Sequence, residues 1–386
     1  MLLPFFLLLS NSPTNFPLNT HICEKYNFHS TRTLNNNYIV LVLLSINNNY
    51  NSSIFVSIMF IFRLFIISFL FLALRVDKAN AQLSYKKVRN KLLSYSEIFV
   101  DPSGHGNFTT IQSAIDSIPS NNKHWMAIRV KVGTYREKVV IPEDKPYILL
   151  KGSGKRKTLV EWNDHSDLRI PTFSSLADNI VVKAISFRNS YNNPINNKPK
   201  LPAIAAKVSG DKTYFFRVGF YGYQDTLYDS KGRHYYKLCT IQGAVDFIFG
   251  AGQSLFERCS ISVIGDGYIT AQGRESPNDS NGFVVKDSHV FGNATTYLGR
   301  AWRQYARVLF YNTNLTNVIQ PLGWDSWSFS THENLITFAE YGNFGPSAET
   351  SKRVGWVNKL DKASIENMAS VNFIDHKKEW IYNHPH

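Results

Sequence analysis

From about residue 95 onward, hydrophobic residues occur in short segments that are rich in β-branched and aromatic side chains and are separated by Gly and Asn. This pattern predicts short β-strands joined by turns. Helical periodicity is scarce. One segment, TTIQSAIDSIP, has apolar residues at Ile111, Ala114, Ile115 and Ile118 and predicts a brief helix. No Pro- or Ser-rich linker interrupts the region, so we predict one domain over residues 95–386.

A hydrophobic phrase recurs in this region. Each copy begins with an aromatic or aliphatic pair and ends on an apolar residue, 20 to 33 residues after the end of the previous copy. The six end residues are Phe187, Phe220, Ile241, Ile261, Val290 and Leu315. A period of this length is typical of a solenoid, and strand-like repeats make it an all-β protein with a parallel β-helix fold.

A β-sandwich is the alternative fold. Its antiparallel strands would be joined by hairpin signals such as Asn-Gly or Asp-Gly. The sequence has Asn-Gly at 281 and Asp-Gly at 266, but such pairs do not separate every two strands. The β-helix is therefore favoured.

The repeat brings two carboxylates together. Asp225 and Asp246 each lie five residues after a repeat end, Phe220 and Ile241, so they should stand side by side on neighbouring coils. Two carboxylates that close do not both ionise easily, which raises one pKa and lets them divide acid and base roles. Asp266 has the same offset, but its setting, IGDGY, is typical of a turn.

The apolar run CTIQGAVDFIFG contains Asp246, and a buried charge without partners is costly. Strict alternation through this run predicts Val245, Phe247 and Phe249 on the interior face and Asp246 on the outer face. The alternative is a buried Asp that is bound to backbone amides and has no catalytic role.

Two cysteines also share a register. Cys239 and Cys259 each lie two residues before a repeat end, so they should stack on adjacent coils about 4.8 Å apart. That spacing suits a disulfide, and a stacked pair of free thiols is the alternative. The sequence shows no metal-ligand cluster, and we expect no metal or other cofactor.

The N-terminal part has a different character. Residues 59–81 have an early Arg, an apolar run of residues 64–74 and a small-x-small site at 79–81, which predicts a secretory signal peptide cleaved after Ala81. The run is too short for a membrane span, so we expect no stable membrane association. We interpret residues 1–58 as a non-native extension and residues 82–94 as a short lead-in. A genuine N-terminal extension with an internal anchor is the alternative.

The net charge of the chain narrows the class of binding partner. The 386-residue chain has a net charge of +13, and the part after residue 81, with 37 basic and 27 acidic residues, has +10. Such a surface favours polyanions. Secretion argues against nucleic acid and for an extracellular acidic polymer. Four N-glycosylation triplets suit the same compartment, at Asn107, Asn278, Asn293 and Asn314.

Three blocks in order, YGYQDTLYD, GAVDFIFG and YLGRAWRQYARVLF, closely resemble the signature blocks of plant pectin methylesterases. Supporting blocks include TAQGR, PLGWDSW and YGNFGPSAETSKRVGW. The resemblance implies a right-handed parallel β-helix with a shallow cleft on its outer face. It also implies a secreted monomer that hydrolyses the methyl esters of homogalacturonan (pectin) in plant cell walls. It leaves open whether a proteinaceous pectinesterase inhibitor binds.

The resemblance also assigns roles to site residues. Asp246 corresponds to the nucleophile, Asp225 to the general acid/base and Gln224 to a stabiliser of the oxyanion. Arg300 corresponds to the residue that orients the nucleophile, and we expect it to lower the pKa of Asp246. Trp302 corresponds to a residue that contacts the sugar.

Two features depart from the family pattern. Where most members begin a QAVAL-like block with Gln, a second oxyanion donor, this chain has PAIAA, and Pro202 has neither a side-chain donor nor a backbone N–H. The chain also resembles the short form without the helical inhibitor-like pro-region, since residues 82–95 are too few to form one. The alternatives to an esterase are a non-catalytic pectin-binding relative and a β-helical lyase or glycosidase.

Overall fold

The computed structural model describes residues 64, 68, 96–377 and 379–385. The predicted extension 1–58, the signal peptide 59–81 apart from residues 64 and 68, and the lead-in 82–94 therefore lie outside the described residues. The described residues from 96 onward belong to one compact unit. None of the described helices is long and apolar enough to cross a bilayer.

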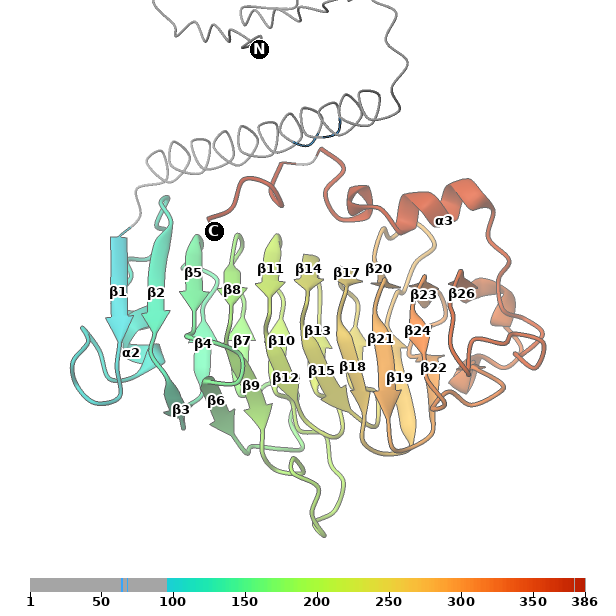
Figure 1. Cartoon of the computed structure of the whole chain (residues 1–386), viewed down its shortest axis with the longest axis horizontal. Coiled ribbons are helices and arrows are strands. Elements are labelled where there is room, and N and C mark those ends of the chain that lie inside the picture. The colour runs from blue at the N-terminus through green and yellow to red at the C-terminus, as the bar shows by residue number, and fades with distance from the viewer. Residues whose placement is uncertain (1–63, 65–67, 69–95, 378, 386) are drawn as a thin grey trace, which may run out of the picture. The chain divides into compact units, whose positions relative to one another are not determined.

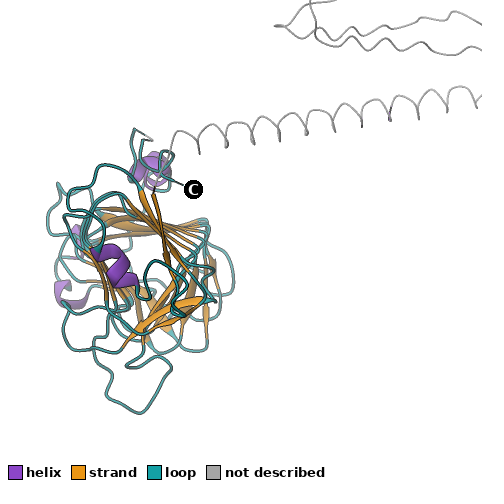
Figure 2. Ribbon diagram, turned by 90° about the vertical axis from the view of Figure 1, so that its left-hand side faces the viewer, coloured by secondary structure: helices purple, strands orange, loops and turns teal. Residues whose placement is uncertain are grey.

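The described strands form a right-handed parallel β-helix with three parallel sheets of ten, eight and eight strands, here called sheets A, B and C (Figures 1 and 2). The strands of sheet A are β1 (Ser96–Val100), β2 (Met126–Val130), β5 (Ile148–Lys151), β8 (Val181–Lys183), β11 (Thr213–Phe216), β14 (Arg233–Lys237), β17 (Gln253–Glu257), β20 (Gly282–Lys286), β23 (Arg307–Tyr311) and β26 (Thr337–Tyr341). Those of sheet B are β3 (Gly133–Tyr135), β6 (Thr158–Trp162), β9 (Ser186–Asn189), β12 (Gly219–Tyr221), β15 (Thr240–Gly243), β18 (Ser260–Val263), β21 (His289–Gly292) and β24 (Asn314–Leu315). Those of sheet C are β4 (Val139–Ile141), β7 (Phe173–Ser175), β10 (Ala206–Val208), β13 (Leu227–Asp229), β16 (Ile248–Gly250), β19 (Gly267–Gln272), β22 (Thr296–Ala301) and β25 (Trp324–Asp325).

The predicted repeat is the register of sheet B. Phe220 pairs with Phe187 on one side and with Ile241 on the other. The pairing continues from Ile241 through the remaining three repeat ends, Ile261, Val290 and Leu315. Each repeat is thus one coil, and the β-sandwich alternative is excluded because every strand pair between these coils is parallel.

The three sheets enclose one interior (Figure 2). The core is a column of stacked side chains in this interior. Aromatic rings from successive coils stack along it, as Phe215 and Phe256 do on either face of Tyr236, with centroids 4.9 and 4.5 Å apart. Coil stacking places identical positions directly above one another, so a large apolar residue in one coil meets its counterpart in the next.

Sharp bends join sheet A to sheet B. At this A–B corner one residue of each coil has a left-handed backbone, with φ between 47° and 56° in six successive coils: Ala184, Arg217, Leu238, Arg258, Asp287 and Asn312. This conformation costs a non-glycine residue roughly 1–2 kcal/mol. The parallel ladders on both sides of the bend offset that cost.

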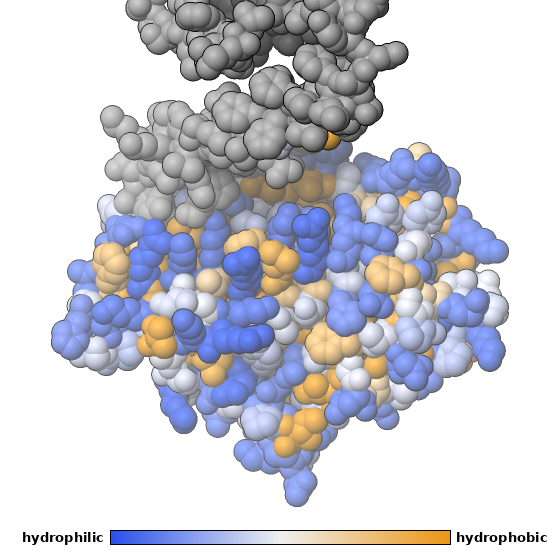
Figure 3. Space-filling model, viewed as in Figure 1, coloured by the Kyte–Doolittle hydropathy of each residue, from blue (hydrophilic) through white to orange (hydrophobic). Residues whose placement is uncertain are grey.

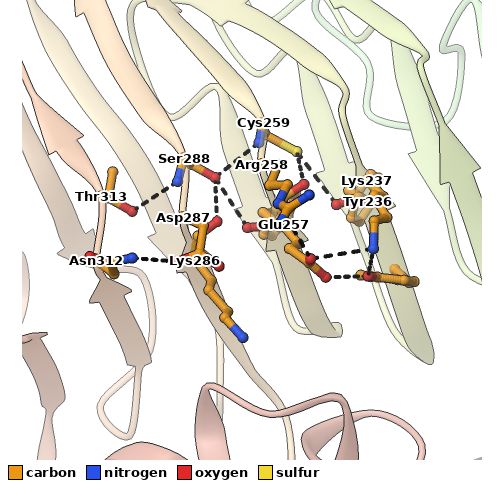
Figure 4. A network of polar contacts seen from close by, with 12 residues as sticks. Tyr236, Lys237, Glu257, Arg258, Cys259, Lys286, Asp287, Ser288, Asn312 and Thr313 are labelled. Carbon is orange, nitrogen blue, oxygen red and sulfur yellow. Dashed lines mark hydrogen bonds and ion pairs between the residues drawn. The ribbon is translucent and has the colours of Figure 1, made fainter. Parts of the chain in front are cut away.

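Cys239 and Cys259, which the sequence predicts to stack, lie just inside this corner, and both are free thiols. The disulfide alternative is therefore not what the structure has. Further along the corner, hydroxyl groups take over the stack: the Ser288 hydroxyl accepts a hydrogen bond from the Cys259 amide (3.0 Å), and Thr313 accepts one from the Ser288 amide (3.4 Å) (Figure 4).

The predicted helix exists as α2 (Ile111–Asp116), and its buried residues join the core at the β1 end of the solenoid. At the other end, α3 (Lys362–Met368) and the 3₁₀ turn η4 (Val371–Phe373) belong to a C-terminal segment whose apolar side chains pack on the outer face of sheet A. Two further 3₁₀ turns, η2 (Trp327–Phe329) and η3 (Glu333–Leu335), follow β25.

Candidate active site

The two predicted carboxylates lie at the bend between sheets B and C, the B–C corner. Both have left-handed backbones, with φ of 61° at Asp225 and 50° at Asp246. Gln224 pairs in parallel with Val245, and the Asp225 amide donates to the Val245 carbonyl (2.9 Å). Asp225 and Asp246 therefore occupy the same position on successive coils, as the repeat predicts.

The predicted facing of this run is correct only in part. Phe247 lies in the core, but Ile248 does as well, and Phe249 belongs to a separate cluster on the outer side of sheet C. The prediction of an inward Phe249 is wrong because the left-handed residue at Asp246 turns the chain. Alternation does not continue through a bend, so Phe247 and Ile248 both face the core and the predicted faces are exchanged from Ile248 onward.

Asp246 is held by a two-point ion pair. The Arg300 Nε donates to Oδ1 of Asp246 (2.8 Å), and the Nη2 group donates to Oδ2. Asp246 is only 8% exposed, so this pair is largely shielded from water. Such forked pairs are stronger and more directional than a single contact. The alternative of an Asp bound only to backbone amides does not describe this side chain.

The guanidinium of Arg300 is itself clamped between two aromatic rings. Its Cζ lies 3.5 Å from the centroid of Trp327 and 4.3 Å from that of Tyr268. Asp325 holds the Tyr268 ring and the Trp327 backbone, because it accepts hydrogen bonds from the Tyr268 hydroxyl (2.8 Å) and from the Trp327 backbone amide (2.7 Å). Arg300 thus has little freedom to leave Asp246.

The two carboxyl groups differ electrostatically. Burial, helped by the charge of Asp246, raises the pKa of Asp225 to about 7, although Arg300 opposes the shift. Burial also raises the pKa of Asp246, against the hydrogen bonds and charge of Arg300. Arg300 lowers the pKa of Asp246, as expected, but burial outweighs the guanidinium and the net shift is upward. Asp225 has no such direct partner among the described residues, so it is the group that keeps its proton to higher pH.

Gln224 and Trp302 are the two remaining predicted site residues. Gln224 directly precedes Asp225, and its side-chain amide makes no hydrogen bond to another described residue. Trp302 follows β22, and its ring meets Phe249 and Tyr228 edge-on, with centroids 5.9 and 6.4 Å apart. Gln224, Tyr228 and Phe249 therefore lie on the same coils as the carboxylates, and Trp302 reaches those aromatic rings from two coils beyond Asp246 to form an aromatic wall.

Pro202 lies one coil earlier. The amide of its neighbour Ala203 donates to the Gln224 carbonyl (3.1 Å), which places Pro202 beside the Gln224 bend. Before it, the loop of residues 190–201 extends beyond the strand ends (Figure 1). Asn193 anchors this loop by donating to the Gly222 carbonyl (2.9 Å) and to Oε1 of Gln242 (2.8 Å).

Comparison with known proteins identifies the family. A sequence model described as Pectinesterase matches residues 97–377. The chain belongs to the pectinesterase family. It is 55% identical to Probable pectinesterase 29 of Arabidopsis thaliana over 301 residues, which cover 75% of this chain and 90% of that one. It is 54% identical to Probable pectinesterase 55 of the same plant, with 75% and 91% covered.

Among solved structures, a pectin methylesterase from carrot superposes with a TM-score of 0.69 at 28% identity, over 74% of this chain and 95% of that one. A pectin methylesterase from Aspergillus niger superposes with a TM-score of 0.64, also at 28% identity, over 73% and 96%. The pectinesterase fold therefore accounts for nearly the whole of the described solenoid.

Sequence reasoning missed the aromatic clamp of this pectinesterase-family site. Ile248 pairs with Thr270, so the residue opposite Asp246 on the next coil is Tyr268, two positions earlier on that strand. Asp266 lies instead in an exposed bend and accepts hydrogen bonds from Thr295, in agreement with the predicted turn. Two extra residues between Ile261 and Thr270 shift the register by two. The PLGWDSW block, which supplies Trp327, was the available signal.

Proposed function

We propose that this chain hydrolyses the methyl esters of pectin and releases demethylated pectin and methanol. The observation that carries the proposal is the pair of carboxyls at the B–C corner, of which one is held by Arg300 and the other has a pKa of about 7. Membership of the pectinesterase family supports the same reaction.

In the proposed mechanism, Asp246 is the nucleophile. Its carboxylate oxygen forms a bond to the C6 carbonyl carbon of the ester, and the ester bond to methoxide breaks. Protonated Asp225 gives its proton to the leaving methoxide, which departs as methanol, and an acyl-enzyme anhydride remains. Asp225, now ionised, takes a proton from water. The resulting hydroxide attacks the same carbonyl carbon, which releases the acid product and regenerates Asp246.

Gln224 is the proposed donor to the oxyanion of both tetrahedral intermediates. Its amide follows the same bend as Asp225 and is not engaged by another described residue. Losing one donor of this kind typically costs about 100-fold or more in rate. Pro202 supplies no second donor at the neighbouring position, so a backbone amide or water takes that place in the proposal.

The sugar chain is proposed to lie across the outer face of sheet C. Trp302 offers a flat apolar face for a sugar ring, and Tyr228 and Phe249 extend that surface along the coils, with ring centroids 4.5 Å apart. These aromatics continue the wall from the carboxylates toward the next sugar unit. A linear polymer such as homogalacturonan suits an open surface of this shape.

We also propose that the chain is secreted to the cell wall, with residues 59–81 as the signal peptide and 95–386 as the working domain. Asn107, Asn278 and Asn293 are exposed, as glycan acceptors must be, whereas Asn314 is half-buried in β24. N-terminal sequencing of the secreted protein should begin near Gln82. A chain that keeps residues 59–81 after secretion would contradict this processing.

A non-catalytic pectin-binding protein is the second candidate, favoured by Pro202 alone. Methanol release from highly methylated pectin separates the two functions. The purified protein should release methanol, and the Asp246→Asn variant, which keeps the shape but not the nucleophile, should not. Equal output from both proteins would falsify the esterase proposal. Chain cleavage without methanol would instead indicate a lyase or glycosidase.

A further inference from the structure

A basic hollow lies at the A–B corner, on a different corner of the solenoid from the carboxylates. It has a volume of about 500 Å³. Its lining residues are Ser153, Gly154, Lys155, Arg156, Lys157, Ala184 and Arg217. Four of these seven are cationic and none is acidic. The proposed esterase chemistry uses none of them.

The loop that forms one wall is held in place by hydrogen bonds. The Gly154 amide donates to the Ala184 carbonyl (2.9 Å), and the Ser153 amide donates to the Thr158 hydroxyl (3.0 Å). The Ser153 hydroxyl donates to the Val130 carbonyl (2.9 Å). The wall therefore keeps its shape without a ligand, and binding there would need little ordering of the chain.

The cations of the hollow divide into one that is engaged and three that are exposed. The Lys155 ammonium donates to the Thr240 hydroxyl (2.8 Å), across the surface of sheet B. Arg156, Lys157 and Arg217 are exposed, and no ion pair joins them to an acidic residue of the described chain. Like charges gathered without acids repel one another, and an anion relieves that repulsion.

Coil geometry extends the positive charge into a row. Arg217 and Arg258 are the left-handed bend residues of coils two apart, so their backbones are about 10 Å apart along the solenoid axis. Arg258 is also largely exposed, and its only ion-pair contact among the described residues is a long one of 4.0 Å from its Nε to Oε1 of Glu257. The bend residues of the coils in between, Ala184 and Leu238, are uncharged, so the cations recur at every second coil, from the loop of Lys155–Lys157 to Arg217 and Arg258. A row of cations at this spacing suits a linear polyanion that lies along the axis better than it suits a single small anion. Much of the surface is hydrophilic in the view of Figure 3.

We propose that the A–B corner is a binding site for the carboxylates of an acidic polysaccharide, namely demethylated stretches of pectin. The identity of this polymer rests on the proposed function, whose product gains one carboxylate for each ester cleaved. Guanidinium groups bind carboxylates through two parallel hydrogen bonds. The site holds the protein on polymer that has already been processed, while the B–C corner acts on methylated units.

The test compares two triple variants of the full protein with the same change in net charge. Arg156→Ser, Lys157→Ser and Arg217→Ser together remove the three exposed positive charges of the hollow. Lys155 is left unchanged because its contact with Thr240 supports the loop. The control is Lys123→Ser, Lys352→Ser and Lys359→Ser, three exposed lysines outside the hollow. The probe is fully demethylated polygalacturonate, and binding is measured by calorimetry over a series of NaCl concentrations.

The hollow variant should bind polygalacturonate about tenfold more weakly than the control at low salt and show a shallower salt dependence. Methanol release from a short methylated oligomer should be the same in both variants. Equal loss in the two, or no loss in the first, would overturn the site. If the triple variant does not fold, Arg217→Glu set against Lys352→Glu asks the same question with one charge each.

This result is separate from the fate of the esterase proposal. The probe has no ester, so binding is measured without turnover. A protein that binds polygalacturonate through the corner but releases no methanol would keep this site and reject the esterase. If the protein releases methanol but both variants bind polygalacturonate equally, the esterase proposal stands and the A–B corner site is rejected.

Discussion

At the scale of single residues, the site separates two aspartates by their surroundings. Asp225 and Asp246 have the same side chain, the same left-handed backbone and equivalent positions on successive coils. Only Asp246 receives the forked contact from Arg300. Burial raises the pKa of Asp225, and no direct guanidinium contact opposes it. Asp225 is therefore the proton donor in the proposed mechanism.

This difference makes Asp225 a stability cost at neutral pH. Its pKa is raised from 3.8 to about 7 in the folded protein, so folding becomes less favourable as pH rises between those values. Asp225→Asn should remove up to about 4 kcal/mol of that cost above pH 7 and almost none at pH 4, while it removes the proton donor. Thermal unfolding at pH 4 and pH 8 checks this. A variant no more stable than the parent at pH 8 would contradict the raised pKa.

Pro202 is the residue that sets this chain apart from the family pattern. Pro202→Gln introduces a side-chain amide beside Gln224, and we expect methanol release to rise, by up to about 100-fold if the second oxyanion donor is fully restored. Pro202→Ala is the control, because it frees the backbone N–H without adding a side-chain donor. A gain in kcat of equal size in both variants would assign the effect to the backbone instead of the amide.

At the scale of elements, bends present Asp225, Asp246 and Gln224, while strand β22 supplies Arg300. The two aspartates lie at the B–C corner, and the loop 190–201 stands beside them, tied down by Asn193. Strands supply the aromatic wall and the fixed spacing between coils. This division is common in solenoids, because a rigid ladder positions short connecting segments that are free to vary.

The loop anchor offers a test at this scale. Asn193→Ala removes hydrogen bonds to the Gly222 carbonyl and to Gln242 and leaves both acceptors without this donor. We expect a loss of about 1–3 kcal/mol in the free energy of unfolding and a higher KM, because the loop borders the bend that carries Gln224. Chemical denaturation and methanol kinetics measure the two effects.

The matched control for that loop is Asn197→Ala, at an exposed position of the same loop. It should change neither quantity by a measurable amount. If both variants raise KM equally, the loop acts through its general mobility and the anchor has no special role.

At the scale of the whole molecule, the outer surfaces of the solenoid differ in chemical character. The outer side of sheet C carries the aromatic wall, and the A–B corner carries the basic hollow. The outer side of sheet A is apolar, with residues such as Leu149, Leu255 and Leu309, and the C-terminal segment covers it with Phe373 and Ile374. Without this segment, the apolar outer face of sheet A would be exposed to water.

This cover should matter for stability and not for chemistry. Ile374→Ala removes a fully buried side chain from the segment, at a cost of about 2–4 kcal/mol, and should increase binding of a hydrophobic dye. The KM for methylated pectin should not change, because the B–C corner lies away from this face. Lys377→Ala, at an exposed position, serves as the control in a thermal unfolding measurement. Identical melting temperatures for the two variants would show that the cover contributes nothing.

The sequence by itself determined the coil register, the pairing of Asp225 with Asp246 and the helix at the β1 end. These follow from local periods, because a solenoid repeats its geometry at every coil and equal offsets become neighbours. The sequence did not determine the outward turn of Phe249, the clamp of Tyr268 and Trp327 around Arg300, or the upward pKa shift of Asp246. Bends reset alternation, an insertion moves the register, and desolvation depends on atoms from segments far apart in the chain. Only the tertiary structure brings those atoms together.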